Sequence, residues 1–295
     1  MPSSPSRVFL VSGASRGLGL EIVRAALDAG HRVVAGSRGA SALDGLAAAH
    51  GDRLAVVPLD VTDDRAVAAA VRTAVDRFGR LDVLVNNAGY ANLAAIEHVD
   101  FDDFRAQVET NLFGVVRLTR AALPVLRAQG AGHIVQVSSV GGRLATPGAA
   151  AYQSAKWAVS GFSSVLAAEV APLGIKVTVL EPGGMRTDWG GASMRIDPVR
   201  PEYAGTVGRV AAMHETDAIG ASDPAKVARL VLDVVAMPQP PLRLLVGADA
   251  YRYATAAGRE LLAEDERWRP LTESTTADDV TAEQLDPLAH QASTS

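Results

Sequence analysis

The chain has 295 residues, of which 48% are hydrophobic, and it carries a formal net charge of -5 at pH 7. This acidic balance, without any cluster of basic and aromatic residues, argues against a nucleic-acid partner. The chain has no cysteine, and its six histidines are scattered without metal-ligand spacing, so we expect neither disulfides nor a metal site. No apolar run approaches the roughly 20 residues of a membrane span, and residues 1–6 lack the apolar stretch of a secretory signal. These features predict a cytoplasmic protein without a membrane partner.

Apolar, β-like runs alternate along the chain with alanine-rich helical stretches. Such alternation predicts a doubly wound α/β fold of the Rossmann type, with a parallel sheet and helices on both faces. We expect one domain over residues 7–270, between a disordered N-terminus at 1–6 and a disordered tail at 271–295 that is rich in Thr, Ser, Asp, Glu and Gln. The expected strands lie near residues 7–12, 31–36, 53–59, 81–86, 132–138, 175–181 and 242–246.

The first expected strand runs directly into a glycine-rich loop, which an amphipathic helix follows. Glycine lacks a Cβ, so the backbone can turn sharply and approach a pyrophosphate, which is favoured at the positive N-terminus of a helix. The spacing Gly-x3-Gly-x-Gly differs from the Gly-x-Gly-x-x-Gly of most dinucleotide enzymes. Such a loop could be an ordinary turn, but its place between strand and helix predicts nucleotide binding by Gly13, Ser15, Arg16, Gly17, Leu18 and Gly19.

The end of the second expected strand indicates which nucleotide is preferred. Enzymes that use NAD usually place an acidic residue there, which accepts the ribose hydroxyls and repels a 2′-phosphate. Here the chain reads Ser37-Arg38, and Arg16 lies within the glycine loop. Two guanidinium groups could hold the phosphate, so we expect NADP(H) to be preferred over NAD(H). The alternative is that both arginines are surface residues without this role.

Tyr152 and Lys156 are four residues apart in an expected helix, so their side chains share one face. A neighbouring cation favours the phenolate and lowers the pKa of a tyrosine from its usual value of about 10 toward the working range. Such a pair suits proton transfer to or from an alcohol. The pattern alone is equally compatible with a tyrosine on the core beside a solvated lysine.

With these motifs the chain resembles the single-domain branch of the short-chain dehydrogenase/reductase family. The likeness spans roughly residues 7–250, and it implies the strand order 3-2-1-4-5-6-7, with the site at the C-terminal ends of the strands. The further matching signatures, in order, are Asn86-Asn87-Ala88-Gly89 after a strand, Asn111 in a helical stretch, Ser139 thirteen residues before Tyr152, and Pro182-Gly183-Gly184-Met185-Arg186-Thr187.

The resemblance implies that Asn111, Ser139, Tyr152 and Lys156 are catalytic. Tyr152 would be the general acid or base, and Ser139 would hydrogen-bond the carbonyl oxygen. Lys156 would hold the nicotinamide ribose and lower the pKa of Tyr152, while Asn111 would hold a water that links Lys156 to solvent. Besides the glycine loop, the cofactor contacts would be Ser37, Arg38, Asp60, Val61, Asn87, Ala88, Gly89, Tyr152, Lys156, Pro182, Gly183 and Thr187.

The function that the resemblance implies is hydride transfer between NADPH and a carbonyl or secondary alcohol, as in a ketoreductase or alcohol dehydrogenase, with reduction favoured. Two other functions stay open. An NADPH-binding redox sensor is disfavoured because the serine, tyrosine and lysine are all retained. A non-redox isomerase or lyase is disfavoured because such relatives tend to alter the tyrosine, the serine or the glycine loop.

The stretch 187–223 interrupts the alternation of strands and helices and resembles the family's substrate loop. Trp189, Met194, Tyr203 and Met213 could line an apolar pocket there, or they could be plain core residues. The expected substrate is therefore a moderately apolar small molecule with a carbonyl or alcohol group, and its identity stays open.

The helix that carries Tyr152 is also a candidate subunit face, since in the family it often packs against its symmetry mate. Trp157, Val159, Phe162 and Leu166 could form such a face, or they could face their own sheet. We expect a homodimer or homotetramer. The preceding loop, Gly141 to Gly148, carries Arg143 as its only charge, and the sequence assigns no role to it.

Overall fold

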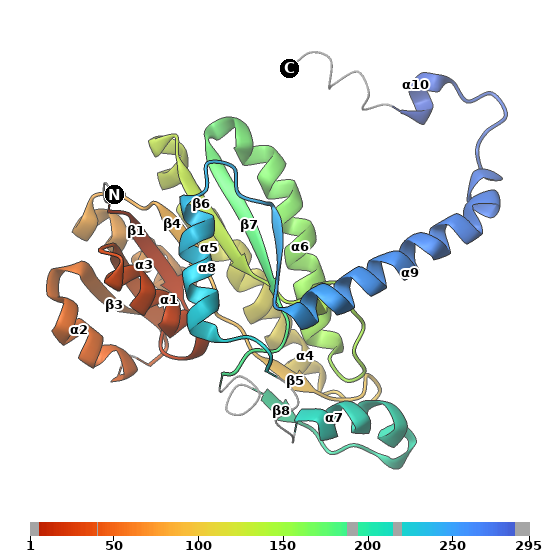
Figure 1. Ribbon diagram of the computed structural model, residues 1–295, viewed down its shortest axis with the longest axis horizontal. Helices are drawn as coiled ribbons and strands as arrows, with labels where there is room; N and C mark the ends of the chain where they lie inside the picture. Colours follow the sequence, from red (N-terminus) through yellow and green to blue (C-terminus); the bar gives the residue numbers. More distant parts are fainter. Residues whose placement is uncertain (1–5, 40, 188–193, 215–219, 287–295) are drawn as a thin grey trace. The chain divides into compact units, whose positions relative to one another are not determined.

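A seven-stranded parallel sheet forms the centre of the computed structural model, which describes residues 6–39, 41–187, 194–214 and 220–286 (Figure 1). Its strand order is β3-β2-β1-β4-β6-β7-β9. Counted within this sheet alone, that is 3-2-1-4-5-6-7, so the predicted Rossmann-type fold and strand order are confirmed. The strands are β1 (Val8–Ser12), β2 (Arg32–Ser37), β3 (Leu54–Pro58), β4 (Val83–Asn86), β6 (Gly132–Val137), β7 (Ile175–Pro182) and β9 (Arg243–Val246).

Helices connect the strands, and their ends carry the expected capping residues. Asp63, Asp100 and Asp223 each accept two backbone N–H bonds at the start of a helix. Gly79 and Gly130 end two helices in the left-handed conformation that favours glycine. The helices are α1 (Gly17–Asp28), α2 (Asp44–His50), α3 (Asp64–Phe78), α4 (Phe101–Val108), α5 (Gly114–Gln129), α6 (Ala150–Val170), α7 (Arg209–His214), α8 (Pro224–Ala236), α9 (Ala248–Glu273) and α10 (Ala282–Leu285).

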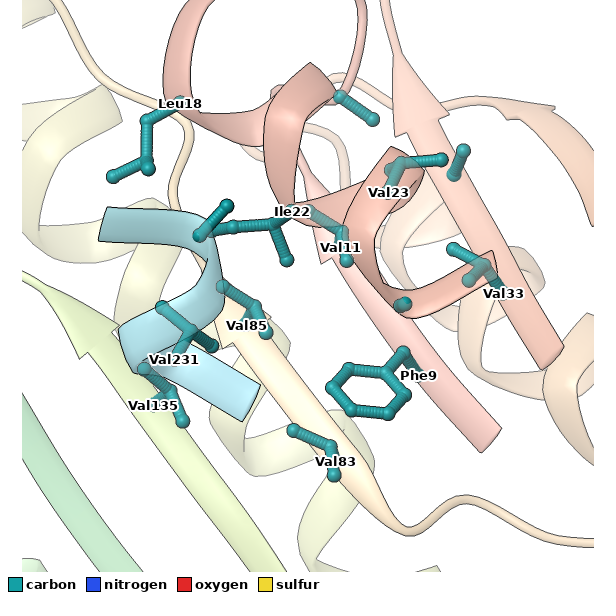
Figure 2. Close-up of a cluster of buried hydrophobic side chains, with 14 of the residues drawn as sticks. Phe9, Val11, Leu18, Ile22, Val23, Val33, Val83, Val85, Val135 and Val231 are labelled. Atoms are coloured by element: carbon teal, nitrogen blue, oxygen red, sulfur yellow. The ribbon is translucent and has the colours of Figure 1, made fainter. Parts of the chain in front are cut away.

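Each face of the sheet is buried by its own layer of helices. On one face, Ile22 of α1 and Val231 of α8 pack over Val11 of β1 (Figure 2). On the other face, α3, α5 and α6 cover residues such as Leu10 and Leu84. Strands buried on both faces are apolar at nearly every position, which is why they appear in the sequence as continuous hydrophobic runs. The two layers leave the C-terminal ends of the strands as the edge where polar side chains can gather.

A second, two-stranded parallel sheet pairs β5 (Ala91–Leu93) with β8 (Met194–Ile196), which the sequence did not predict. Its strands have three residues each, too short for a recognisable period-two pattern. The described part of the expected substrate loop therefore holds regular structure: β8, the turns η7 (Pro201–Tyr203) and η8 (Ala204–Gly208), and α7.

The chain divides into two compact units, Met1–Ala254 and Thr255–Ser295, so the division falls earlier than the expected domain end at residue 270. Helix α9 begins in the first unit and ends in the second, and α10 carries a capping box between Thr281 and Gln284. Residues 1–5 and 287–295 of the expected disordered ends lie outside the described residues. Among the helices of the described ranges, none is both long and apolar enough to cross a membrane.

His133 of β6 is a buried titratable group that the site does not use. Its Nε2 lies 3.0 Å from Thr178 Oγ1, and the Thr178 hydroxyl donates to the carbonyl of Pro241 at 2.8 Å. Thr178 Oγ1 therefore accepts from an Nε2–H, which fixes the imidazole as the Nε2-protonated neutral tautomer. Burial, helped by the positive charge of Lys176, lowers the pKa of His133 from 6.5 to about 4.

This depressed pKa predicts acid sensitivity that His133→Gln should reduce. Between about pH 6.5 and pH 4 the unfolded chain binds more protons at this site than the folded chain, so the free energy of unfolding falls as the pH falls. Between pH 7 and pH 4, the free energy of unfolding measured in urea should fall by up to about 3 kcal/mol less in the variant than in the wild type. The matched variant His50→Gln on α2 controls for the replacement of a histidine by glutamine elsewhere in the fold. If the free energy of unfolding changes equally with pH in the wild type and in His133→Gln, His133 does not titrate as inferred.

Candidate active site

A cavity of about 1200 Å³ opens at the C-terminal ends of the sheet strands. All four predicted catalytic residues line it: Asn111, Ser139, Tyr152 and Lys156. Gly19 is the one predicted cofactor contact that does not line the cavity. Those that do are Gly13, Ser15, Arg16, Gly17, Leu18, Ser37, Arg38, Asp60, Val61, Asn87, Ala88, Gly89, Tyr152, Lys156, Pro182, Gly183 and Thr187.

The glycine loop has the geometry expected for close approach to a ligand. Gly13 has a φ of +66°, and a Cβ there would lie 2.9 Å from the Cα of Ala88. A Cβ on Gly19 would overlap the carbonyl oxygen of Gly13, so Gly19 is required for packing rather than for direct contact. Helix α1 begins at Gly17, and no side chain caps its N-terminus. Free backbone N–H groups at a helix N-terminus facing a cavity suit an anion such as a pyrophosphate.

Asn87 braces this loop with its side chain. Its Nδ2 donates to the carbonyls of Ser12 and Gly13 at 3.0 and 3.1 Å. In return, Ser12 Oγ accepts the backbone N–H groups of Asn87 and Ala88 at 3.0 and 3.1 Å. The Asn-Asn-Ala-Gly segment thus holds the loops after β1 and β4 together, in addition to lining the cavity.

Two arginines border the cavity near the end of β2. Arg16 and Arg38 are both exposed, and no acidic residue stands at the strand end itself. Ser37 donates from Oγ to the carbonyl of Gly39 at 2.6 Å, which orders the turn that carries Arg38. The pKa of Asp60 is lowered mainly by the backbone N–H of Thr62, with a smaller contribution from the charge of Arg38. The carboxylate of Asp60 therefore stays ionised as part of its own turn.

Tyr152 and Lys156 lie on α6, as the spacing predicted. Burial raises the pKa of Tyr152 to about 12, and a hydrogen bond with Ser139 opposes this rise. The expected lowering by Lys156 is wrong for this structure. The Nζ of Lys156 lies 5.5 Å from the centre of the Tyr152 ring and donates to the carbonyl of Val137 at 2.8 Å. The ammonium therefore lies over the ring and is bonded to the end of β6.

Lys156 itself is almost fully buried, with 4% of its surface exposed. Burial lowers the pKa of its ammonium to about 8, because the charged form loses hydration. Ser138 Oγ donates to the backbone carbonyl of Lys156 at 3.3 Å. Strand β6 and helix α6 therefore hold each other through this lysine.

Asn111 lies on a π-helical turn, η3 (Glu109–Phe113), between α4 and α5, where the sequence predicted ordinary helix. Its Nδ2 donates to the carbonyls of Tyr90 and Gln107, each at 2.8 Å, and its Oδ1 accepts the Tyr90 N–H at 3.2 Å. A Cβ at Gly89 would lie 2.5 Å from this Oδ1, so the glycine is required here. π-Helical turns are rare and frequently mark functional sites.

The sequence profile described as short chain dehydrogenase matches residues 7–195. The chain belongs to the short-chain dehydrogenase/reductase family. It is 53% identical over 269 residues to "Oxidoreductase BOA17" of Botryotinia fuckeliana (strain B05.10), covering 90% of this chain and 98% of that protein. It is therefore an oxidoreductase of this family.

Two solved structures have a similar fold. A short-chain dehydrogenase from Streptomyces avermitilis superposes with a TM-score of 0.88 at 38% identity, covering 93% of this chain and 100% of that one. An alcohol dehydrogenase from the archaeon Thermococcus sibiricus, complexed with 5-hydroxy-NADP, gives a TM-score of 0.69 at 26% identity, covering 83% and 97% of the two chains.

The sequence predicted only part of the lining of this cavity. Met194 and Met213 line it as considered, whereas Trp189 lies outside the described residues. Tyr203 is not part of the lining, and its hydroxyl donates to Glu97 at 2.6 Å. Polar residues that the motifs did not single out include Gln153, which adjoins Tyr152 and could have been found from that position. The apolar additions Leu93, Leu144 and Val210 carry no sequence signal of their own.

Gly19→Ala should weaken dinucleotide binding, because the added methyl meets the Gly13 carbonyl and lies 2.5 Å from Asn87 Nδ2. We expect at least about tenfold weaker binding of NADPH and NADH by calorimetry, with a loss of about 1–3 kcal/mol in stability. The matched variant Gly45→Ala on α2 should bind normally, since nothing lies within 4 Å of its added Cβ. Wild-type affinity in Gly19→Ala would contradict the close approach of the two loops.

Proposed function

We propose that this oxidoreductase reduces a carbonyl compound with NADPH, or carries out the reverse oxidation of a secondary alcohol. The observation that carries the proposal is the hydrogen bond between Tyr152 and Ser139 at the wall of the cavity, one helical turn from the buried Lys156. A proton donor, a hydroxyl for an oxyanion and a buried cation are the groups that carbonyl reduction requires of a protein.

The cavity also fits a nicotinamide dinucleotide. The uncapped start of α1 would hold the pyrophosphate, and Gly13 allows the loop before this helix to pack closely against Ala88. Thr187, Pro182 and Gly183 line the end of the cavity that the nicotinamide would occupy by family analogy. When bound, the reduced nicotinamide would supply the hydride.

The protein would supply the proton and stabilise the developing charge. Tyr152 is protonated at neutral pH, because its pKa is raised to about 12, so it can donate a proton to the nascent alkoxide. Ser139 Oγ would donate a hydrogen bond to the same oxygen. Lys156 would hold the ribose and place a positive charge near the site. The side-chain nitrogen of Asn111 is occupied by two backbone carbonyls, so a backbone carbonyl of η3 is the better candidate for holding a water near Lys156.

We further propose a preference for NADPH, supported by Arg16 and Arg38 at the cavity and by the absence of an acid at the end of β2. The apolar lining of Leu93, Leu144 and Met194 supports a moderately apolar substrate. A cytoplasmic location and a homo-oligomer remain predictions. Of the residues considered for a subunit face, Val159 and Leu166 are buried within the chain, which leaves Trp157, at 51% exposure, as the main candidate contact, while Phe162 is half-buried.

Tyr152→Phe tests the proposal, because it keeps the ring and removes the proton donor. We expect kcat to fall about 100- to 10 000-fold, with NADPH affinity unchanged, on a panel of ketones, aldehydes and alcohols followed at 340 nm. Tyr253→Phe, at an exposed tyrosine of α9, should turn over like the wild type. If the wild-type protein binds NADPH but turns over no compound of the panel, the result would favour a redox sensor. Product without any change in nicotinamide absorbance would favour an isomerase or lyase.

Arg38→Gln tests the nucleotide preference. Losing a charge-assisted hydrogen bond to the 2′-phosphate should raise the Kd of NADPH about 10- to 100-fold and leave that of NADH within about twofold. The matched variant Arg24→Gln, which removes an exposed arginine paired with Glu21 on α1, should change neither. Equal weakening of both nucleotides would contradict a role for Arg38 in phosphate recognition.

A further inference from the structure

Glu181 is a carboxylate with no exposed surface, on β7 directly before Pro182. Burying an ionised carboxylate is costly unless an opposite charge compensates it. The compensating charge is Arg143, whose Nη2 lies 2.5 Å from Glu181 Oε2. Neither oxygen of Glu181 accepts a hydrogen bond within the described ranges, so its contact with Arg143 is an ion pair without hydrogen-bond geometry, and Arg143 Nε is likewise buried without a hydrogen bond. The two side chains therefore depend on each other.

Arg143 is the residue that closes the turn beginning at Ser139. Ser139 Oγ accepts the Gly141 N–H at 3.0 Å, and the Gly142 N–H donates to the Ser139 carbonyl at 2.9 Å. The Arg143 N–H then completes the turn η4 (Val140–Gly142) by donating to the carbonyl of its first residue at 2.8 Å. A shift of the Arg143 backbone would therefore be transmitted to Ser139, four residues earlier.

Glu181 lies near the end of β7, which is itself well fixed. Pro182 and Gly183, which follow it, line the cavity. The Gly183 N–H donates to the carbonyl of Val246 on β9 at 3.0 Å, and the Gly184 N–H donates to Asp249 Oδ2 at 2.8 Å. The Ser138 N–H, just before the turn, donates to the carbonyl of Leu180 on β7 at 2.9 Å, and the ion pair adds a side-chain link between the far end of the turn and the same strand.

We propose that Arg143 and Glu181 are positioning residues for the reaction. Their ion pair holds the turn of Ser139 against the end of β7, which keeps the Ser139 hydroxyl bonded to Tyr152 and facing the part of the cavity beside Pro182 and Gly183. Stability alone does not require this arrangement, because buried ion pairs can often be replaced by apolar residues without loss of stability. The inference rests on the proposed carbonyl reduction for its kinetic test.

Glu181→Gln is the informative variant, since it keeps the shape of the side chain and removes its charge. We expect kcat to fall at least tenfold in protein with native circular dichroism, while the Kd of NADPH stays within about threefold. Arg143→Met should lower kcat to a similar extent, whereas Arg143→Lys should retain more activity because it keeps the positive charge. The kcat of the double variant Arg143→Met/Glu181→Gln should be no lower than that of the slower single variant. Glu21→Gln, which breaks the exposed pair with Arg24, is the matched control and should keep the wild-type kcat.

Where Glu181→Gln does not fold, Arg143→Met/Glu181→Leu gives the apolar replacement for the same measurement. Wild-type kcat in either folded variant overturns the proposal. A readout without turnover is amide hydrogen exchange of residues 139–148, which should quicken in Glu181→Gln and not in Glu21→Gln. Unchanged exchange overturns the positioning role. If the wild type turns over no substrate while Glu181→Gln still shows the quickened exchange, only the proposed reaction is overturned.

Discussion

The site depends on one close approach, between the backbone that leaves β1 and the backbone that leaves β4. Only a glycine fits at position 13, because a Cβ would meet Ala88, and the Asn87 amide and the Ser12 hydroxyl tie the two segments together. Helix α1 starts from this loop, so its N-terminus is fixed relative to β4. A pyrophosphate held there would lie at a fixed distance from the cavity residues that follow β4 and β6, such as Asn87 and Ser139.

Strand β6 pairs with β4 and extends the same constraint to the reacting groups. Lys156 donates to the carbonyl of Val137 at the end of β6, and Ser138 bonds back to the carbonyl of Lys156. These reciprocal bonds fix α6 against the strand, and Tyr152 lies one turn earlier on that helix. The glycine loop and the Tyr152 end of the cavity are therefore positioned by neighbouring strands of one sheet.

Sequence reasoning succeeded where the signal was local. The seven strands, the glycine loop and the shared face of Tyr152 and Lys156 follow from residue spacing, and each lies where it was expected. It failed where the outcome depends on distance in space. The π-helical turn at Asn111, whose side chain bonds to the backbone carbonyls of Tyr90 and Gln107, has no signature in residue spacing. The lowered pKa expected for Tyr152 did not account for the burial of its side chain, which raises the pKa.

The pair of Arg143 and Glu181 illustrates the same limit. The sequence shows one arginine in a glycine-rich loop and one glutamate at the end of an apolar strand, and nothing in either neighbourhood indicates that they meet. A charge placed among buried apolar residues is nevertheless a usable signal, since it must find a partner or destabilise the fold. Position 181 has such surroundings, so a search for its counter-ion could have started from the sequence.

The high pKa of Tyr152 links the direction of the reaction to the charge of the cofactor. A phenol with a pKa of about 12 retains its proton at neutral pH, which suits donation to an alkoxide during reduction. Alcohol oxidation needs the phenolate, which a positively charged oxidised nicotinamide would favour and a neutral reduced one would not. Burial and the hydrogen bond with Ser139 set the pKa of Tyr152 in this structure, so a bound oxidised nicotinamide would add a positive charge that favours the phenolate.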